Sequence, residues 1–556
     1  MFYKDIGGIY FFKEVKNLNN RNKLALTKIQ AVLIIAVVAV VAIAGYYFMQ
    51  PAPPKTQKVL VVACAALGRN PDPAYAFSDL TSFTISMACY DTLVGRGTSK
   101  LPDGTEYFDI SKVAATGLAE SWNVSSDGRV YTFKLRHGIK FQNGNPFNAE
   151  AVRYSYNRAI NMGFAPGWLL GLCGMNLNST KVIDDYTVQI TVNNPNPFLL
   201  TALSYVGIVD PVYVEEHGGV KAGAFNDWMV SHSMGTGPFN LTKYDPSTEA
   251  ILEANKDYWG GAPKLDKIII RYVPETSMRE LMIKTGEVDV ATEIPPKDVA
   301  DLKNASGVKL EINQMVRIGK ITMWWMQAPF NNTKVRQAIA HAIPYDKLIK
   351  DVMYNMGTLY YSIVGPDGFG YQPAWNKYDY NLTKAKELLT EAGYPNGFKC
   401  TFTIPDSILP DQEMTVVILQ SELAKLGIEM EIKKVAAAEF GNLMRAGKLE
   451  MFITRWQPAY NDVIYVAYIM HYSKINYLTS GGYNNTAFDK LVEQAMVEAD
   501  ATKRLQLCYD MQRILAEDVA CIPTYQYPDI TAFRTNIKGF KFLNSGAILY
   551  YYLDKV

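Results

Sequence analysis

The feature that most constrains this chain is an uncharged apolar run near its N-terminus. Residues 31–49 contain no Asp, Glu, Lys or Arg, and a helix of about 20 such residues crosses the ~30 Å hydrocarbon core of a bilayer. Residues 1–30 are typical of a cytoplasmic or signal n-region, and the Pro-rich stretch 50–57 is typical of a linker. The pattern predicts one N-terminal transmembrane or signal helix at 31–49, followed by a large folded part.

Positive charge before the apolar run predicts its orientation. The basic residues before it include Lys13, Lys16, Arg21, Lys23 and Lys28. Such a bias keeps the N-terminal side in the cytoplasm. We therefore expect the folded part to be extracytoplasmic and tethered to the cell membrane by the N-terminal helix.

The residues just before the run bear on processing. Residues 23–30 resemble the pilin-like signal sequences of archaeal surface binding proteins, which are cut before the hydrophobic stretch, here near Ala25. An ordinary secretory signal cut after the run, or an anchor that is never cut, fits the same residues.

Length and charge limit the possible domain organisation and partners of the rest of the chain. With 556 residues, 49% of them hydrophobic, the chain exceeds what one core usually organises, so two or three lobes are expected. Lys and Arg number 55 and Asp and Glu 54, for a formal charge of +1. This balance lacks the basic excess that binding to a phosphate backbone requires, so we expect no nucleic-acid partner.

Motifs of catalysis and metal binding are missing from the sequence. The six cysteines are scattered without CxxC spacing, the five histidines lie far apart, and no G-x-S-x-G, H-E-x-x-H or Walker-type motif occurs. We expect neither an enzyme nor a cofactor or metal. A membrane-anchored hydrolase with a carboxylate pair of no fixed spacing stays open as an alternative, as does a structural surface protein.

Strand-like and helix-like patterns both occur along the chain. Residues 58–63 form a short apolar run and 131–135 alternate between apolar and polar, as strands do. Apolar residues recur at helical spacing over 385–392, with Asn381 placed to cap the helix and Gly393 to end it. The mixture predicts α/β lobes.

A series of sequence blocks occurs in a distinctive order. They are 117–122 (GLAESW), 126–128 (SDG), 131–136 (YTFKLR), 148–154 (NAEAVRY), 235–239 (GTGPF), 255–266 (NKDYWGGAPKLD), 286–289 (GEVD) and 335–339 (VRQAI). This order resembles that of the family 5 extracellular solute-binding proteins of ABC importers, whose members bind oligopeptides, dipeptides, oligosaccharides or nickel. The resemblance extends over nearly the whole chain from residue 58.

The resemblance implies a fold and a function. It implies a two-lobed, periplasmic-binding-protein-like (type II) α/β fold with an extra subdomain, acting as a monomer that captures a peptide or oligosaccharide and delivers it to membrane permease subunits. It implies the following limits: lobe I from 58–85, 197–315 and 525–556, the extra subdomain from 86–196, and lobe II from 316–524. Such lobes close on the ligand like a hinge.

The ligand segment by this resemblance is 456–462 (WQPAYND). It is similar to the family's W-x-x-D-Y-x-D/E-P motif, with Ala459 in place of the first Asp and Val463 in place of the Pro. In peptide-binding relatives that Asp pairs with the α-ammonium of the ligand, so Ala459 weakens the case for peptides with a free amine. Asp462 takes over this role only if the loop shifts, because its usual role in the family is to close the turn.

Aromatic and polar side chains complete the predicted ligand site. Its residues are Trp456, Tyr460, Asp462, Trp324 and Trp325, with Phe77, Ser78 and Asp79 from the lobe I side of the cleft. Flat aromatic faces suit sugar rings or bulky side chains. Arg455 is expected to point away from Trp456, since neighbours on a strand face opposite sides. Nickel is not expected, because no histidine falls in the matched segments.

Overall fold

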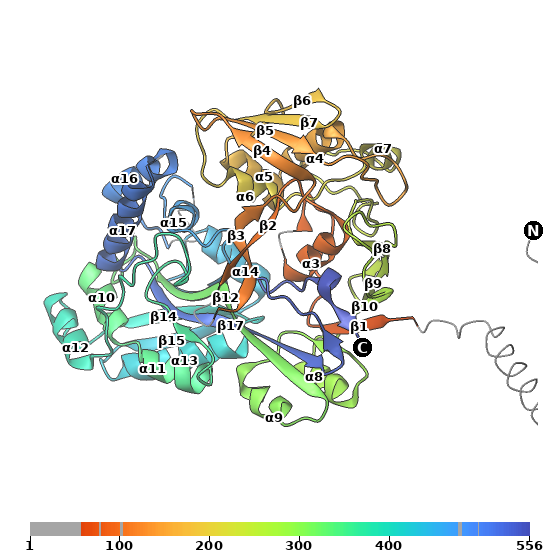
Figure 1. Ribbon diagram of the computed structural model, residues 1–556. Coiled ribbons are helices and arrows are strands. Elements are labelled where there is room, and N and C mark those ends of the chain that lie inside the picture. Colours follow the sequence, from red (N-terminus) through yellow and green to blue (C-terminus); the bar gives the residue numbers. More distant parts are fainter. Residues whose placement is uncertain (1–56, 77–78, 101–103, 476–480, 499) are drawn as a thin grey trace, which may run out of the picture. The chain divides into compact units, whose positions relative to one another are not determined.

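The computed structural model describes residues 57–76, 79–100, 104–475, 481–498 and 500–556. Those from Lys58 onward belong to one compact unit, Lys58–Val556, drawn in colour in Figure 1. The predicted signal region, apolar helix and most of the linker lie outside the described residues, as do Phe77 and Ser78. Within the described ranges, no helix combines the length and the apolar character needed to cross a bilayer.

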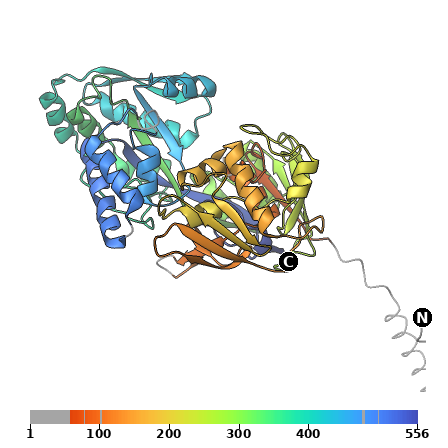
Figure 2. The ribbon, with the colours of Figure 1, turned by 90° about the horizontal axis from the view of Figure 1, so that it is seen from above.

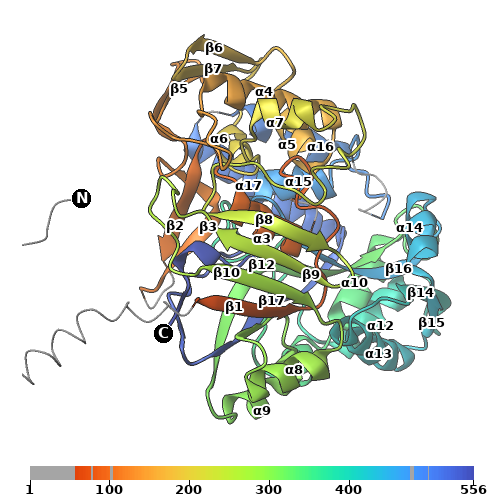
Figure 3. The same ribbon diagram turned by 90° about the vertical axis from the view of Figure 1, so that its right-hand side faces the viewer.

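One large mixed sheet runs through this unit. In spatial order its strands are β15 (Glu429–Val435), β14 (Lys399–Pro405), β16 (Met451–Trp456), β12 (Val308–Met323), β17 (Ile522–Arg534), β11 (Val290–Ala291), β1 (Val59–Cys64), β10 (Lys267–Tyr272), β9 (Glu249–Ala254) and β8 (Phe239–Asp245), with β13 (Thr358–Leu359) paired to β17. Strand β1 is parallel to both neighbours, whereas β12 and β17 are antiparallel. Figure 3 shows β8, β9, β10 and β1 side by side.

Two long strands join the predicted lobes. The first half of β12 pairs with the part of β17 that also contacts β11, and its second half pairs with β16. The register between β12 and β17 shifts between Gln314 and Ile318, where three residues of β12 stand against one of β17. A bulge of this kind bends a strand. Seen from above in Figure 2, the cyan and blue elements of predicted lobe II gather together, apart from the red, orange and yellow elements.

The elements of predicted lobe I and the extra subdomain contact the large sheet and one another. Helix α3 (Leu80–Cys89) contacts β8, α8 (Thr276–Thr285) contacts β11 and β17, and α9 (Val299–Lys303) contacts β12 and the short 3₁₀ turn Pro296–Asp298. The predicted subdomain contains the hairpin β2 (Gly95–Lys100) and β3 (Glu106–Ala114), the four-stranded sheet β4 (Ala119–Val124), β5 (Val130–Leu135), β7 (Thr187–Thr191) and β6 (Thr180–Asp184), and helices α4 (Ala149–Met162) and α5 (Ala165–Leu172). Helices α6 (Leu199–Leu203) and α7 (Pro211–Glu216) of predicted lobe I contact α5 and α4, respectively.

Predicted lobe II is rich in helices. They are α10 (Thr333–His341), α11 (Tyr345–Lys347), the π-turn Leu348–Val352, α12 (Leu382–Glu391), α13 (Pro410–Ala424), α14 (Ala437–Arg445), α15 (Val463–Met470), α16 (Thr486–Val497) and α17 (Ala501–Asp518). The chain ends with β18 (Ile537–Lys538), the 3₁₀ turn Tyr550–Tyr552 and β19 (Asp554–Lys555). The α/β class predicted from the patterns is confirmed.

Local signals in the sequence have the expected physical outcomes. Asn381 caps α12 by accepting from the backbone N–H of Lys384 at 2.9 Å, and Gly393, with φ of 89°, ends that helix. The alternating residues of β5 bury Tyr131, Phe133 and Leu135. All six cysteines are free and buried. The limits predicted for the lobes and the subdomain stay predictions.

Candidate functional site

The centre of the predicted site is the segment 456–462, which links β16 to α15. Trp456 is the last residue of β16 and pairs with Ile318 of β12. Asp462 is the N-cap of α15, and its Oδ1 accepts from the backbone N–H of Ile464 at 2.7 Å. Burial raises the pKa of Asp462 to about 6, although the N–H groups that it accepts act in the opposite direction. Asp462 therefore closes the turn into α15.

The middle of this segment contacts residues from far earlier in the chain. The Tyr205 hydroxyl donates to the Ala459 carbonyl at 2.6 Å, and the Asn461 N–H donates to Ser111 Oγ at 2.9 Å. Gln457 adds a third contact, because its Nε2 donates to the Ser545 carbonyl at 3.1 Å. The segment thus lies where predicted lobe II meets predicted lobe I and its subdomain.

Tyr460 is a packing residue in this arrangement. Its ring stacks on Phe198, with ring centroids 5.1 Å apart, and meets Tyr465 edge to face at 4.6 Å. The side chain is buried, and its hydroxyl has no hydrogen-bond partner. Burial raises the pKa of Tyr460 well above its ordinary value. In this conformation the Tyr460 ring packs against both Phe198 and Tyr465 and faces no open space.

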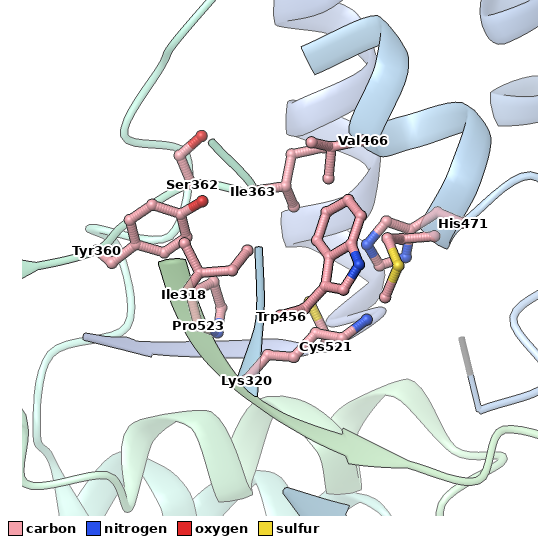
Figure 4. Close-up of a pocket in the computed structure, with 11 residues that line it drawn as sticks. Ile318, Lys320, Tyr360, Ser362, Ile363, Trp456, Val466, His471, Cys521 and Pro523 are labelled. Atoms are coloured by element: carbon pink, nitrogen blue, oxygen red, sulfur yellow. The ribbon is translucent and has the colours of Figure 1, made fainter. Parts of the chain in front are cut away.

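Trp456 covers a small cavity in predicted lobe II, drawn in Figure 4. The cavity measures about 10 Å³, which is room for roughly one water molecule. Its lining comes from β12, β16, β17, the 360–363 stretch and α15 with the residue after it: Ile318, Lys320, Tyr360, Ser362, Ile363, Trp456, Val466, Met470, His471, Cys521 and Pro523. Most of these side chains are apolar.

Three of the lining residues carry polar atoms without a partner. Lys320 Nζ, His471 Nδ1 and the Tyr360 hydroxyl make no hydrogen bond, and the three residues are 4%, 1% and 2% exposed. In Figure 4 the Lys320 side chain extends beneath Trp456 toward His471, whereas Tyr360 lies on the other side. Burial lowers the pKa of Lys320, and burial together with the charge of Lys320 lowers the pKa of His471. Sequence reasoning missed all three, although a lysine inside the apolar strand 315–323 was a usable signal.

The other two predicted tryptophans lie apart from this cavity. Trp324 is buried beside Gly447 and Gly482. Trp325 places its ring 3.6 Å from the Arg336 guanidinium carbon and meets Tyr483 edge to face. Neither tryptophan lines the cavity covered by Trp456. Their contribution to ligand binding stays a prediction.

Of the three predicted residues on the lobe I side, only Asp79 is described. It caps α3, with Oδ1 accepting from the Ser82 N–H at 2.8 Å and Oδ2 from the Arg69 N–H at 3.1 Å. Both carboxylate oxygens are therefore engaged within the chain. Asp79 also borders an open hollow that Gly68, Arg69 and Tyr75 help to line.

Two arginines near the segment, Arg317 and Arg455, interact with other groups of the protein. Arg317 lies in the bulge of β12, and its guanidinium donates to Gln457 Oε1 at 3.2 Å. Burial, with the nearby charge of Arg455, lowers the pKa of Arg317 to about 10. The Arg455 guanidinium lies 5.4 Å from the Tyr527 ring centroid and is not in the lining of the cavity. Among the described residues, no group of three or more His, Cys, Asp or Glu is arranged to hold a metal ion.

Comparison with known proteins decides the family. The profile of the bacterial extracellular solute-binding proteins, family 5 Middle, matches residues 114–477. The chain belongs to this family. Family 5 proteins act outside the cytoplasm, so the resemblance drawn from the ordered sequence blocks is confirmed at that level.

Individual relatives agree with this assignment. The glutathione-binding protein GsiB of Escherichia coli O1:K1 / APEC is 29% identical over 496 residues, which are 87% of this chain and 92% of that protein. The periplasmic binding protein DppA from Helicobacter pylori, solved with the peptide STSA, has a TM-score of 0.74 at 28% identity, covering 89% of this chain and 98% of that one.

A further neighbour supports the fold alone. The substrate-binding protein CtaP of Listeria monocytogenes has a TM-score of 0.79 at 21% identity, covering 90% of this chain and 100% of that one. The periplasmic-binding-protein-like fold is therefore confirmed for the described part of this family 5 chain. These relatives are binding proteins rather than enzymes.

Proposed function

We propose that this family 5 protein is the extracytoplasmic substrate-binding component of an ABC importer. It captures a small solute beside Trp456 and delivers it to permease subunits in the membrane. The observation that carries the proposal is the position of the 456–462 segment, which lies in predicted lobe II and contacts predicted lobe I through Tyr205 and Ser545 and the extra subdomain through Ser111. A segment in this position senses whether the lobes are together, as ligand-dependent closure requires.

The ligand class that we favour is a short peptide or a peptide-like solute. Relatives named for glutathione binding or solved with the peptide STSA support this class. Ala459 offers no carboxylate to a buried ammonium, so the peptide is expected to have a blocked or modified amine. An oligosaccharide remains the second candidate, because Trp456 offers it a stacking face.

The proposed site contains the residues predicted from the sequence, and their positions in the structure give them different roles. Trp456 is the main contact, since it is half-buried and covers a cavity. Tyr460 and Asp462 position the segment. Trp324, Trp325 and Asp79 are engaged in packing or capping in the described conformation, so they join the site only if the lobes move.

The proposed tether is the apolar segment 31–49, with or without cleavage near Ala25. It holds the binding unit outside the cell as a monomer beside its permease. Protease added to intact cells is expected to remove the described unit while leaving cytoplasmic markers whole. Protection of the unit from protease contradicts this topology.

The function is tested by ligand-dependent stabilisation of the purified full chain. Binding to the folded state raises its stability by RT ln(1 + [L]/Kd), so a true ligand raises the melting temperature in proportion to the logarithm of its concentration. A flat response across a peptide and oligosaccharide library favours a structural surface protein. Recovery of a chemically changed ligand favours the hydrolase alternative.

A further inference from the structure

The cavity beneath Trp456 contains a buried lysine with no counter-ion. Lys320 lies near the C-terminal end of β12, between Thr454 of β16 and Pro523 of β17. It is 4% exposed, its Nζ makes no hydrogen bond, and no described carboxylate forms an ion pair with it. By contrast Lys309, on the same strand, pairs with Glu311 at 3.2 Å. Lys320 is therefore unlike the paired lysine of its own strand.

An ammonium group in such a place is costly. Transfer of an isolated charge to an apolar environment is strongly unfavourable, so the group loses its proton or gains an anionic partner. The titratable groups that line the cavity with Lys320 are His471, Tyr360 and the Cys521 thiol. None supplies a stable negative charge, because burial raises the pKa of Cys521 to about 11 and that of Tyr360 well above its ordinary value, and a histidine is neutral or cationic. The chain itself thus leaves the anionic position open.

The neighbouring polar atoms are arranged around the same space. His471 Nδ1 lacks a partner, and in Figure 4 Lys320 reaches toward its ring beneath the Trp456 indole. The remaining wall is apolar, with Ile363, Val466 and Met470. An apolar cavity that holds one unpaired cation favours a group with a charged head and a carbon stem.

Trp456 controls access to this position. The cavity holds only about one water molecule in the described conformation, so a larger group enters only when the indole moves. Trp456 is half-buried and ends its strand, and the residues after it are outside regular secondary structure. Entry of a larger group therefore requires the indole to move off Tyr465, on which it is stacked with ring centroids 6.3 Å apart.

We propose that the cavity beneath Trp456 is an anion subsite, in which Lys320 and His471 receive a carboxylate carried by the transported solute. This inference rests on the proposed function and specifies its substrate class. It also agrees with Ala459. The 456–462 segment has no carboxylate at that position to pair with a ligand ammonium, whereas the cavity beside the segment contains a lysine that can pair with a ligand carboxylate. The carboxylate belongs either to a side chain or to the C-terminus of a peptide.

Three N-acetylated tripeptides separate these sources. Acetyl-Ala-Glu-Ala-amide carries only a side-chain acid, acetyl-Ala-Gln-Ala with a free C-terminus carries only a terminal acid, and acetyl-Ala-Gln-Ala-amide carries none. Calorimetry on the purified full chain is expected to give at least one acid-bearing probe an affinity roughly ten- to a hundredfold above that of the neutral probe. Equal affinities for all three overturn the inference while the proposed function stands.

Variants then assign the preference to the lysine. Lys320→Met is expected to reduce the affinity for the acid-bearing probe to that for the neutral one, whereas Lys309→Met is expected to leave both unchanged. A preference that survives Lys320→Met overturns the inference. If that variant does not fold, the probe comparison on the unaltered chain still decides. No binding of any probe, in calorimetry or thermal shift, overturns the proposed function and this inference with it.

Discussion

The hydroxyl of Tyr205 donates a 2.6 Å hydrogen bond to the carbonyl of Ala459, across 254 positions of sequence. The Tyr205 ring is stacked on Phe83 of α3, and the guanidinium carbon of Arg96 lies 4.7 Å from the ring centroid. The bond therefore connects a rigid aromatic group of predicted lobe I to the backbone of the ligand segment. Opening of the lobes has to break it.

Tyr205→Phe tests this connection. The variant keeps the stacked ring and removes the hydroxyl, and a hydrogen bond of this kind contributes about 1 kcal/mol net. We expect ligand affinity to fall about fivefold with a change in melting temperature of only a few degrees. Calorimetry and a thermal scan measure the two effects. An unchanged affinity means that the bond does not contribute to closure.

Trp456→Ala is expected to weaken binding by roughly 2 to 4 kcal/mol, because a large ring at a desolvated contact dominates such a site. The matched control is Trp122→Ala. Trp122 is half-buried, as Trp456 is, but it lies in β4 of the extra subdomain and packs on Phe133, so its loss is expected to lower the melting temperature without a selective loss of affinity. If both variants lose affinity in step with stability, Trp456 acts through packing alone.

The cysteines give a prediction about reactivity. All six are free and buried, and burial raises the pKa of Cys64 and Cys89 to about 12. A thiol that is neither ionised nor accessible reacts slowly. We expect a thiol reagent to label none of the six within minutes in the native protein and all six in denaturant, with no effect of reductant on melting. Rapid native labelling of any cysteine contradicts this description.

The sequence predicted features that depend on residues close together in the chain better than features that depend on distant residues. Caps such as Asn381 and strands such as β5 are set by neighbours within a few residues, so their patterns were sufficient. The family sequence blocks were sufficient to predict the fold, because there are many of them and they occur in a specific order along the chain. Trp456 was selected from its motif, and its role in binding stays a prediction, whereas the role of Tyr460 as a buried packing residue depends on Phe198, more than 250 positions away.

Lys320 illustrates what a single sequence hides. Its position on an apolar strand was visible, but a lysine there is compatible with an exposed edge, a buried ion pair or an open cavity. Only the packing of β12 between β16 and β17, with α15 above, shows that the amine is enclosed and unpaired. Register and layer order decide this, and neither is local.

Asp462 gives the protein a pH dependence with a definite sign. Burial raises its pKa to about 6 in the folded state, against about 3.9 in an unfolded chain. The folded state therefore binds more protons between these values, so the stability contributed by Asp462 is present at low pH and lost as pH rises through 6.

Asp462→Asn tests that dependence, because the amide oxygen still caps α15 and carries no charge. The variant is expected to gain on the order of 2 kcal/mol relative to the parent between pH 4.5 and pH 8. Urea unfolding at the two pH values measures the difference. A difference between variant and parent that does not change with pH contradicts the prediction.

Ala459→Asp restores the acid that peptide-binding relatives carry at the matching position, and it separates the ligand classes. The new carboxylate offers a charge-assisted partner to an α-ammonium, so affinity for a free-amine tetrapeptide is expected to rise. The gain is limited to about tenfold, because Ala459 is buried and a carboxylate placed there loses its hydration. Ala459→Asn is the matched control, with similar size and no charge. The N-acetylated tetrapeptide is expected to bind no better to either variant, and an oligosaccharide to bind the same or more weakly. Calorimetry of both variants against the three ligands decides. Tight binding of the free-amine tetrapeptide by the unaltered protein contradicts the expectation of a blocked amine, since a buried ammonium without a carboxylate is then tolerated at Ala459.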